Sequence, residues 1–297
     1  MNILIIGSKG FIGIHCVDYF SKDHEVWQCD VVTDYTTRNY FTIDATNADY
    51  TEVFKDRNFD VCINCSGAAS VPDSIKNPLR DFNLNVTNVF KQLNTLRKLN
   101  PSCKYINLSS AAVYGNPEYL PIDEAHPCHP ISPYGRHKKM AEDICEEFNK
   151  NYQLKTCSLR IFSAYGEGLR KQLFWDLYSK SKTSETVILY GTGNESRDFI
   201  HVSDVVQAIT VAIESSNFEA DIINVANGKE ISIQDAVAAF YNELDDNSKF
   251  RFGGEKRVGD PINWVANIDR LEEMGYRIKV ELESGLLSYV AWLNDNA

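Results

Sequence analysis

The sequence predicts an α/β fold in which a doubly wound parallel sheet carries helices on both faces. The chain opens with four consecutive apolar residues, Ile3 to Ile6, as is typical of a strand buried on both sides. A glycine-rich turn, Gly7 to Gly13, follows this strand directly and leads into a helical pattern. Strand-like and helix-like stretches then alternate, which favours a parallel sheet of the Rossmann type.

The later elements follow from apolar periodicity and from cap and turn residues. In the first half we expect strands at 25–29, 60–65 and 104–108 and helices at 82–99 and 133–150. In the second half we expect a helix at 170–180, extended stretches at 187–190, 197–202 and 221–225, and a helix after Ser232. Asp269 is expected to cap a short helix that ends at Gly275.

The chain contains no internal repeat and no linker-like run, so we expect one compact body with a cleft between two parts. Residues 1–165, joined by parts of about 195–226, should form the Rossmann domain. Residues 166–297 should form mainly a smaller, interleaved substrate-binding lobe.

The composition is that of a globular protein, with 43% hydrophobic and 24% charged residues among 297. The formal net charge of -11 argues against a nucleic acid or a membrane surface as partner, because those partners attract basic patches. The sequence shows no signal-peptide pattern and no apolar run long enough to span a membrane. Eight scattered cysteines in a chain of this size favour a reducing cytoplasm.

No metal site is expected. Cys62 and Cys65 form a C-x-x-C pair within a predicted strand, where residues three apart point to opposite faces. Cys128 lies between His126 and His129, but no second ligand pair accompanies it at a usual spacing.

The turn after the first strand predicts a dinucleotide site, because glycines at this spacing let a pyrophosphate approach the backbone and let the next helix pack closely. Its candidate cofactor contacts are Gly7, Gly10, Phe11, Ile12 and Gly13. The next strand ends on Asp30, at about the distance along the chain where a carboxylate accepts hydrogen bonds from the adenosine ribose. Asp30 would repel a 2′-phosphate, so NAD is favoured over NADP, with Arg38 as the main contrary feature.

A serine, a tyrosine and a lysine are the candidate catalytic groups. Tyr134 and Lys138 are four residues apart in a predicted helix and would be neighbours on one face. A cation beside a phenol favours the phenolate and lowers the pKa of the phenol toward neutral pH. Ser110 follows a predicted strand at the carboxyl edge of the sheet, where it could meet Tyr134. Taken singly, these residues also fit solvated helix side chains and a turn-forming serine.

Together these motifs resemble the extended short-chain dehydrogenase/reductases, in particular their nucleotide-sugar epimerase and dehydratase group. The resemblance extends over nearly the whole chain. It rests on GSKGFIG at 7–13, SSAAVYG at 109–115, SPYGRHK at 132–138, LRIFSAYGEG at 159–168, RDFIHVSDVV at 197–206 and RVGD at 257–260.

The resemblance assigns roles to individual residues. It implies that Ser110, Tyr134 and Lys138 are catalytic, with Tyr134 as the base. It implies further cofactor contacts at Asp44, Ala45, Asn85, Tyr134 and Lys138. Substrate contacts are implied at Ser110, Ser163, Arg197, Arg257 and Trp264. The two arginines would hold a diphosphate through charge-assisted forks, and Trp264 would exclude an N-acetyl group from the sugar pocket. Helices at 82–99 and 133–150 resemble the pair through which the family forms homodimers, with Leu93, Leu96 and Met140 as candidate contacts.

The implied reaction starts with transient oxidation at C4 of a nucleotide-diphosphate hexose. Ala111 and Ala112 stand where similar 4,6-dehydratases carry the acid and base for water elimination, so dehydration is disfavoured. Our first hypothesis is therefore an NAD-dependent 4-epimerase, and the alternative is an NAD(P)H-dependent reductase of a 4-keto-sugar. A non-catalytic NAD-sensing protein is a third hypothesis, which the intact Ser110, Tyr134 and Lys138 disfavour.

Overall fold

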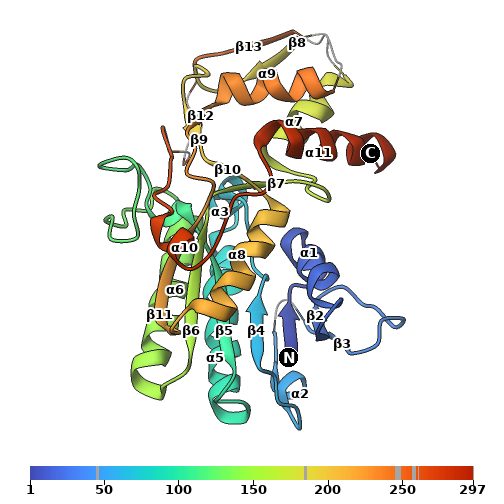
Figure 1. Cartoon of the computed structure of the whole chain (residues 1–297), viewed down its shortest axis with the longest axis vertical. Helices are drawn as coiled ribbons and strands as arrows, with labels where there is room; N and C mark the ends of the chain where they lie inside the picture. Colours follow the sequence, from blue (N-terminus) through green and yellow to red (C-terminus); the bar gives the residue numbers. More distant parts are fainter. Residues whose placement is uncertain (45–46, 184–185, 245–248, 256–258, 260, 297) are drawn as a thin grey trace.

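The computed structural model describes residues 1–44, 47–183, 186–244, 249–255, 259 and 261–296. Its centre is a seven-stranded parallel sheet with the order β11-β6-β5-β4-β1-β2-β3, which confirms the predicted fold class. The strands are β1 (Asn2–Ile6), β2 (Glu25–Asp30), β3 (Tyr40–Thr42), β4 (Val61–Asn64), β5 (Lys104–Ser110), β6 (Thr156–Ile161) and β11 (Glu219–Val225). The chain first leaves β1 toward β3 and later builds the sheet on the other side toward β11, so the sheet is doubly wound (Figure 1).

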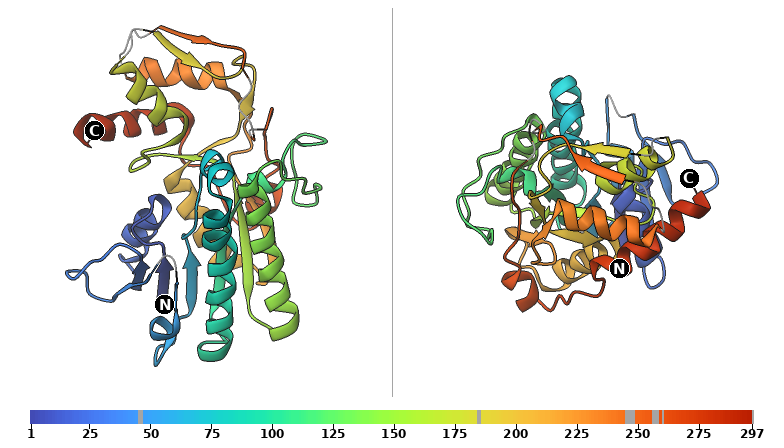
Figure 2. Two further views of the ribbon diagram at one scale, coloured as in Figure 1. Left: turned by 180° about the vertical axis from the view of Figure 1, so that it is seen from behind. Right: turned by 90° about the horizontal axis from the view of Figure 1, so that it is seen from above.

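Strand β1 shows why helices cover both faces of this sheet. Ile3 and Ile5 belong to one hydrophobic core, whereas Leu4 and Ile6 belong to another. Successive side chains of a strand point to opposite faces, so an all-apolar strand requires cover on both sides. The first core is covered by α1 (Phe11–Phe20) and α8 (Val202–Ser215), and the second by α2 (Thr51–Phe54), α5 (Asn88–Leu99) and α6 (Pro133–Tyr152). Figures 1 and 2 show these two helix layers on opposite sides of the sheet.

The segment between β4 and β5 differs from the prediction. The helix expected at 82–99 begins four residues earlier, at Pro78, and runs through α4 (Pro78–Phe82), the π-helical segment η1 (Asn83–Thr87) and α5. Proline suits the first turn of a helix because its missing N–H has no partner there in any case. A short helix, α3 (Val71–Lys76), precedes this run. The polar side chains around position 81 hid this first part of the helix from an analysis based on apolar periodicity.

A second unit with its own core lies beyond the carboxyl edge of the sheet (Figure 1). Its elements are α7 (Gln172–Ser181), α9 (Ile233–Glu243), α11 (Leu282–Asn296) and the parallel pair of β8 (Thr186–Leu189) and β13 (Lys249–Phe252). Aromatic side chains fill this core, and Phe174 stacks on Phe240 with ring centres 5.5 Å apart. The start of α9 is as predicted, because Ser232 Oγ accepts a hydrogen bond from the Asp235 N–H at 3.0 Å.

Two small strand pairs join the second unit to the sheet. The pairs are β7 (Ser163–Tyr165) with β10 (Phe199–His201) and β9 (Ser196–Arg197) with β12 (Ile231–Ser232). The short helix α10 (Asp269–Glu273) packs on β11, and Leu271 joins the first core of the sheet. Asp269 is the first residue of α10 and Ile268 holds the cap position, so the predicted cap at Asp269 was wrong. Gly275, with φ of +107°, lies just after the end of α10, as expected.

All eight cysteines are free thiols. Within the described ranges, no three histidine, cysteine or acidic side chains are grouped closely enough to hold a metal ion. None of the helices in these ranges has the length and apolar character of a membrane span.

Candidate active site

The candidate site lies at the carboxyl edge of the sheet, where β1 and β4 are neighbours. From β1 the chain proceeds to β2 on one side, and β4 continues the sheet on the other. The loops that follow these two strands therefore diverge and leave a crevice between them, which is where open α/β sheets bind ligands.

The glycine-rich turn after β1 has the geometry of an anion-binding loop. Gly7 has φ of +81°, and a Cβ at this position would lie 2.6 Å from Ser66 N. Gly10 precedes α1 without a side-chain cap, so the N–H groups of the first turn of the helix remain available to an anion. The positive end of the helix dipole points at the same place. The turn thus fits a pyrophosphate.

Asp30 ends β2 next to this turn and is buried, with 8% of its surface exposed. Its carboxylate accepts hydrogen bonds from the backbone N–H of Lys9 at 2.8 Å and from that of Val31 at 2.7 Å. The Lys9 ammonium is paired with Asp34 at 2.7 Å, so the nearest lysine is already neutralised. Both features favour a ribose hydroxyl over a phosphate at this position. Asp44 is an exposed residue after β3, and Ala45 lies outside the described residues.

Asn85 provides a further indication of a ligand. It lies in η1, is 1% exposed, and neither atom of its side-chain amide has a hydrogen-bond partner among the described residues. A Cβ at Gly67, in the loop after β4, would lie 2.5 Å from Asn85 Oδ1 and 3.5 Å from Lys138 Nζ. Buried amides are normally hydrogen-bonded. The unpaired Asn85 amide and the Lys138 ammonium next to this crevice therefore fit the polar part of a dinucleotide.

Ser110 and Tyr134 meet at the same edge, as the sequence predicted. Ser110 is the last residue of β5, and its hydroxyl interacts with the Tyr134 phenol. Tyr134 lies in the first turn of α6, whose start is fixed by Pro133 and by the Ser132 hydroxyl, which accepts from Gly135 N at 3.1 Å. Gly135 allows this close approach, because a Cβ there would lie 2.3 Å from the carbonyl oxygen of Ala112.

In the chain without ligands, the pKa of Tyr134 is not lowered toward neutral pH as the sequence analysis expected. Burial raises the pKa of Tyr134 to about 12, and the Ser110 hydroxyl only partly opposes that shift. Lys138 is 7% exposed and its ammonium donates to the Leu108 carbonyl at 2.9 Å, and burial lowers its pKa to about 8. Lys138 Nζ lies 5.9 Å from the centre of the Tyr134 ring. In the chain alone, desolvation thus has the largest effect on the pKa of the phenol.

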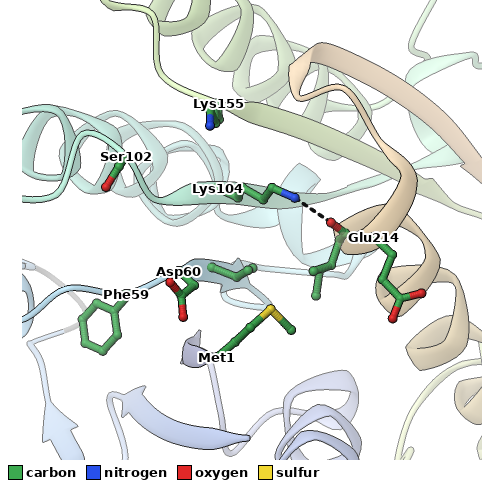
Figure 3. Close-up of a pocket in the computed structure, with 9 residues that line it drawn as sticks. Met1, Phe59, Asp60, Ser102, Lys104, Lys155 and Glu214 are labelled. Atoms are coloured by element: carbon green, nitrogen blue, oxygen red, sulfur yellow. Dashed lines mark hydrogen bonds between the residues drawn. The ribbon is translucent and has the colours of Figure 1, made fainter.

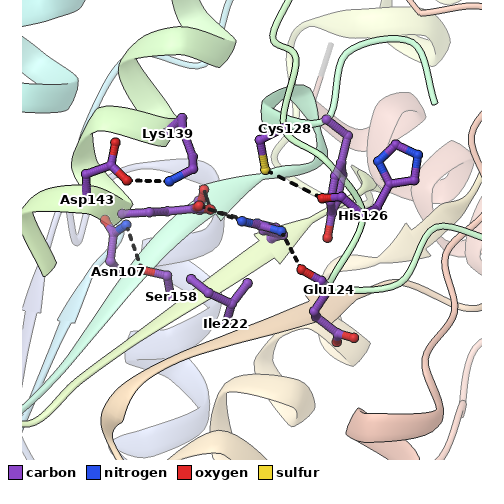
Figure 4. A network of polar contacts seen from close by, with 12 residues as sticks. Asn107, Glu124, His126, Cys128, Lys139, Asp143, Ser158 and Ile222 are labelled. Carbon is purple, nitrogen blue, oxygen red and sulfur yellow. Dashed lines mark hydrogen bonds and ion pairs between the residues drawn. The ribbon is translucent and has the colours of Figure 1, made fainter. Parts of the chain in front are cut away.

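A buried ion pair that the sequence analysis missed holds α6 against the sheet. Glu142 lies one turn after Lys138, and both of its oxygens accept from Arg160 of β6, at 2.9 and 2.8 Å. Ser109, the neighbour of Ser110, donates to the same carboxylate at 2.6 Å. Figure 4 shows the surroundings of this pair, with Asn107 and Ser158 on the strands and Glu124 and His126 on the nearby loop. The arginine in the LRIF segment was a possible signal, since a charge inside a buried strand requires a partner.

Two candidate substrate residues, Ser163 and Arg197, lie in the strand pairs that join the second unit to the sheet. Ser163 begins β7, and its N–H donates to the Asp198 carbonyl at 3.0 Å. Arg197 is half-buried and lies over the Trp264 ring, with its guanidinium carbon 5.5 Å from the ring centre. Trp264 is 9% exposed and donates from Nε1 to the Gly115 carbonyl at 3.1 Å. Arg257 lies outside the described residues.

A separate cavity of about 570 Å³ lies at the opposite edge of the sheet, at the amino ends of the strands. Met1, Asp60, Lys104 and Glu214 are among the residues that line it (Figure 3). The Lys104 ammonium donates to the Ile213 carbonyl at 2.8 Å. This cavity contains none of the candidate site residues and lies away from the edge at which α/β sheets bind ligands.

The fold and the dinucleotide edge define an NAD-dependent enzyme of the doubly wound α/β class. The chain matches the model of the NAD dependent epimerase/dehydratase family over residues 3–226, and it belongs to that family. It is 30% identical over 315 residues to a putative UDP-glucose 4-epimerase of Methanocaldococcus jannaschii, with 99% of each chain covered.

Solved structures are similar over the whole chain as well. A UDP-N-acetylglucosamine 4-epimerase from Methanobrevibacter ruminantium M1, in complex with UDP-N-acetylmuramic acid, has a TM-score of 0.89 and 27% identity, with 100% of this chain and 99% of that chain covered. A UDP-glucuronic acid 4-epimerase from Bacillus cereus, in complex with UDP-glucuronic acid and NAD, has a TM-score of 0.90 with 99% of each chain covered. At 23% identity, the second likeness supports the fold alone.

Proposed function

We propose that this protein is an NAD-dependent nucleotide-sugar epimerase that acts by transient oxidation at C4 of a nucleotide-diphosphate hexose. The observation that carries the proposal is the contact of Ser110 with Tyr134 beside the dinucleotide edge. It stands in a chain that is similar over its full length to a putative UDP-glucose 4-epimerase.

The cofactor would be held along the carboxyl edge of the sheet. The pyrophosphate would lie on the glycine-rich turn, at Gly7, Gly10, Phe11, Ile12 and Gly13. Asp30 would accept hydrogen bonds from the adenosine ribose, with Asp44 and Ala45 near the adenine. Asn85 and Lys138 would contact the nicotinamide half. When bound, NAD supplies a reversible hydride acceptor at this edge.

In the proposed reaction, Tyr134 would accept the proton of the C4 hydroxyl, and bound NAD would be the acceptor for the hydride of C4. Ser110 donates a hydrogen bond to the C4 oxygen, and Lys138 supplies the positive charge that favours the phenolate. The resulting 4-keto-sugar then presents its other face. Tyr134 would then return the proton to the C4 oxygen, and with the hydride restored to that face of C4 the cycle would be redox-neutral and change only the configuration at C4.

Arg197 and Arg257 are proposed to bind the substrate diphosphate, with Ser163 nearby. Arg197 stacks on Trp264, which joins the proposed diphosphate site to the proposed sugar pocket. The indole is fixed by its bond to Gly115 and packs edge-on against Phe162, with ring centres 6.0 Å apart. Such a fixed ring would crowd a C2 N-acetyl group, and overpacking costs about 1 to 3 kcal/mol.

The pocket proposal is tested by comparing kcat/KM for UDP-glucose and UDP-N-acetylglucosamine. We expect kcat/KM to be roughly 10-fold or more higher for UDP-glucose. Trp264→Ser should bring the two kcat/KM values closer together. Trp292→Ser is the matched control, because Trp292 packs on Tyr289 in the second unit. Equal values for the two substrates in the unmodified protein would exclude the proposed role of Trp264.

Two further proposals concern the division of the chain into domains and its location in the cell. We retain a Rossmann domain of residues 1–165 with parts of about 195–226, and a substrate lobe of mainly residues 166–297, supported by the separate core of the second unit. The eight free thiols support a cytoplasmic location.

A homodimer through α5 and α6 is also proposed, but with different contacts from those expected. Leu93 and Leu96 are fully buried in the core of the chain itself and cannot contact a partner. Met140 is 37% exposed on α6 and remains a candidate contact, and Phe90, which is 44% exposed on α5, replaces the two leucines. Figure 2 shows α5 and α6 side by side on the outer face of the molecule. A monomer in sedimentation experiments at micromolar concentration would reject this interface.

The function itself is tested by incubating the purified protein with UDP-glucose without added reductant and separating the products by chromatography. We expect the 4-epimer to form, with NAD retained by the protein and identified by mass spectrometry. Tyr134→Phe is the control for contaminating activity. If no epimer forms, and the protein instead takes up NADPH and reduces a 4-keto-sugar, the reductase hypothesis replaces this one.

A further inference from the structure

A buried ionisable pair lies directly behind the proposed catalytic residues and has no part in the mechanism above. Asp81 of α4 and His137 of α6 are joined by a contact of 2.6 Å between Oδ2 and Nδ1. Their side chains are only 3% and 11% exposed. The Phe82 ring packs edge-on against the imidazole, with ring centres 5.4 Å apart. Water therefore has little access to either side chain.

The spacing of residues by single helical turns places this pair close to the proposed site. His137 lies between Tyr134 and Lys138 in sequence, one turn after the tyrosine. On the opposing segment, Asn85 lies one turn after Asp81. Asp81 Oδ1 and both amide atoms of Asn85 are buried without a hydrogen-bond partner among the described residues. The helices α4, η1 and α6 thus enclose a polar cluster with spare hydrogen-bonding capacity.

A purely mechanical tie between α4 and α6 does not need a carboxylate. The start of α6 is already anchored by the bond from Tyr134 N to Ser74 Oγ at 3.1 Å. An ionised carboxylate that is buried with one unpaired oxygen is costly unless nearby positive charge compensates it. Lys138 is the buried cation on the same helix.

We propose that Asp81 is a positioning residue for the epimerase reaction: held by His137, its carboxylate supplies the negative charge that keeps the buried Lys138 in its ammonium form. This inference rests on the proposed function, because it assigns Lys138 to the cofactor and to the base. Charge interactions are consistent with it, since Asp81 raises the pKa of Lys138 while burial lowers it to about 8. Asp81 also acts on Tyr134, whose pKa it raises.

Other ionisable groups also lie near Lys138. Glu142, on the next turn of α6, and Cys65, in the loop after β4, raise the pKa of Lys138, and Lys171, which precedes α7, lowers it. Arg80 of α4 and the α3 residues Asp73 and Lys76 are exposed to solvent, where their effect is screened. Asp81 is therefore the buried negative charge that a single substitution can remove without breaking the Glu142–Arg160 pair.

The test is the pH dependence of NAD binding, measured by calorimetry between pH 6 and 9. In the unmodified protein, NAD affinity should fall as pH rises through about 8, where Lys138 loses its proton. Asp81→Asn removes a neighbouring charge and should move this transition to lower pH by about one unit. At pH 8 the ammonium fraction would then fall from about one half to about one tenth, which weakens binding about fivefold.

Two further variants separate this effect from a loss of structure. Asp143→Asn removes the same charge from an exposed position of α6 and should leave the transition in place. Asp81→Ala combined with His137→Leu removes both polar groups, leaves neither unpaired, and should show the same shift as Asp81→Asn. A folded Asp81→Asn or double variant with the transition of the unmodified protein would overturn the inference. Failure of the proposed function would show separately, as normal NAD binding without epimerisation in the unmodified protein.

Discussion

Removing the charge of Glu142 should destabilise the fold strongly, because it leaves a buried guanidinium without its counter-charge. The Arg160 and Glu142 side chains are 5% and 2% exposed and share two hydrogen bonds, and Ser109 adds a third to the same carboxylate. Breaking a buried pair by removing one partner typically costs about 3 to 5 kcal/mol. In Glu142→Gln the amide oxygen can still accept a hydrogen bond from one N–H. We therefore expect a loss of unfolding free energy of about 3 kcal/mol, at the lower end of this range.

Urea unfolding followed by circular dichroism and by tryptophan fluorescence measures this loss. The midpoint should fall while the slope of the free energy against urea concentration stays constant. Glu146→Gln is the matched control, because Glu146 lies one turn further on α6 and is exposed, and it should cost less than about 0.5 kcal/mol. Glu142→Leu combined with Arg160→Met should recover most of the loss, because neither charge is then left alone. A loss below about 1 kcal/mol for Glu142→Gln, or a double variant as unstable as the single one, would refute this reasoning.

Three further outcomes concern the site. Tyr134→Phe should reduce kcat at least 100-fold and leave the Kd for NAD nearly unchanged, and more than ~10% residual kcat would remove Tyr134 from the role of base. Lys138→Met should abolish the fall in NAD affinity above pH 8, since the neutral side chain has no proton to lose, and a retained transition would point to another group. Gly7→Ala should weaken NAD binding by more than 10-fold, because its Cβ would meet Ser66 N at 2.6 Å. Gly254→Ala, with similar φ of +82° and no atom within 4 Å of its Cβ, isolates backbone strain and should leave NAD binding intact.

The sequence alone was sufficient for the features that depend on local pattern. An all-apolar run at Ile3 to Ile6 is typical of a strand covered on both faces, and the glycine spacing after it fits a dinucleotide-binding turn. The helix start at Pro133 follows from Ser132 and the proline, so the spacing of Tyr134 and Lys138 on one face was also determined locally. These signals involve neighbours within one or two turns, which is why they can be interpreted without the fold.

The wrong prediction of Leu93 and Leu96 as subunit contacts involves partners far apart in the chain. Leu93 and Leu96 have the apolar period of a helix face, but that period does not say whether a sheet or a second subunit covers the face. The sequence around Trp264 likewise does not indicate its hydrogen bond to the Gly115 carbonyl, which lies 149 positions away.

What the sequence determined about this protein is therefore the doubly wound fold, the dinucleotide turn and the spacing of its proposed catalytic residues. Only the tertiary structure showed that Arg160 donates two hydrogen bonds to Glu142, which also accepts one from Ser109. Only the tertiary structure showed that Asp81 contacts His137, the neighbour of Lys138 in the sequence. The physical reason is that burial sets the strength of these electrostatic interactions. Burial depends on which distant segments pack together, and a local pattern of residues carries no record of that.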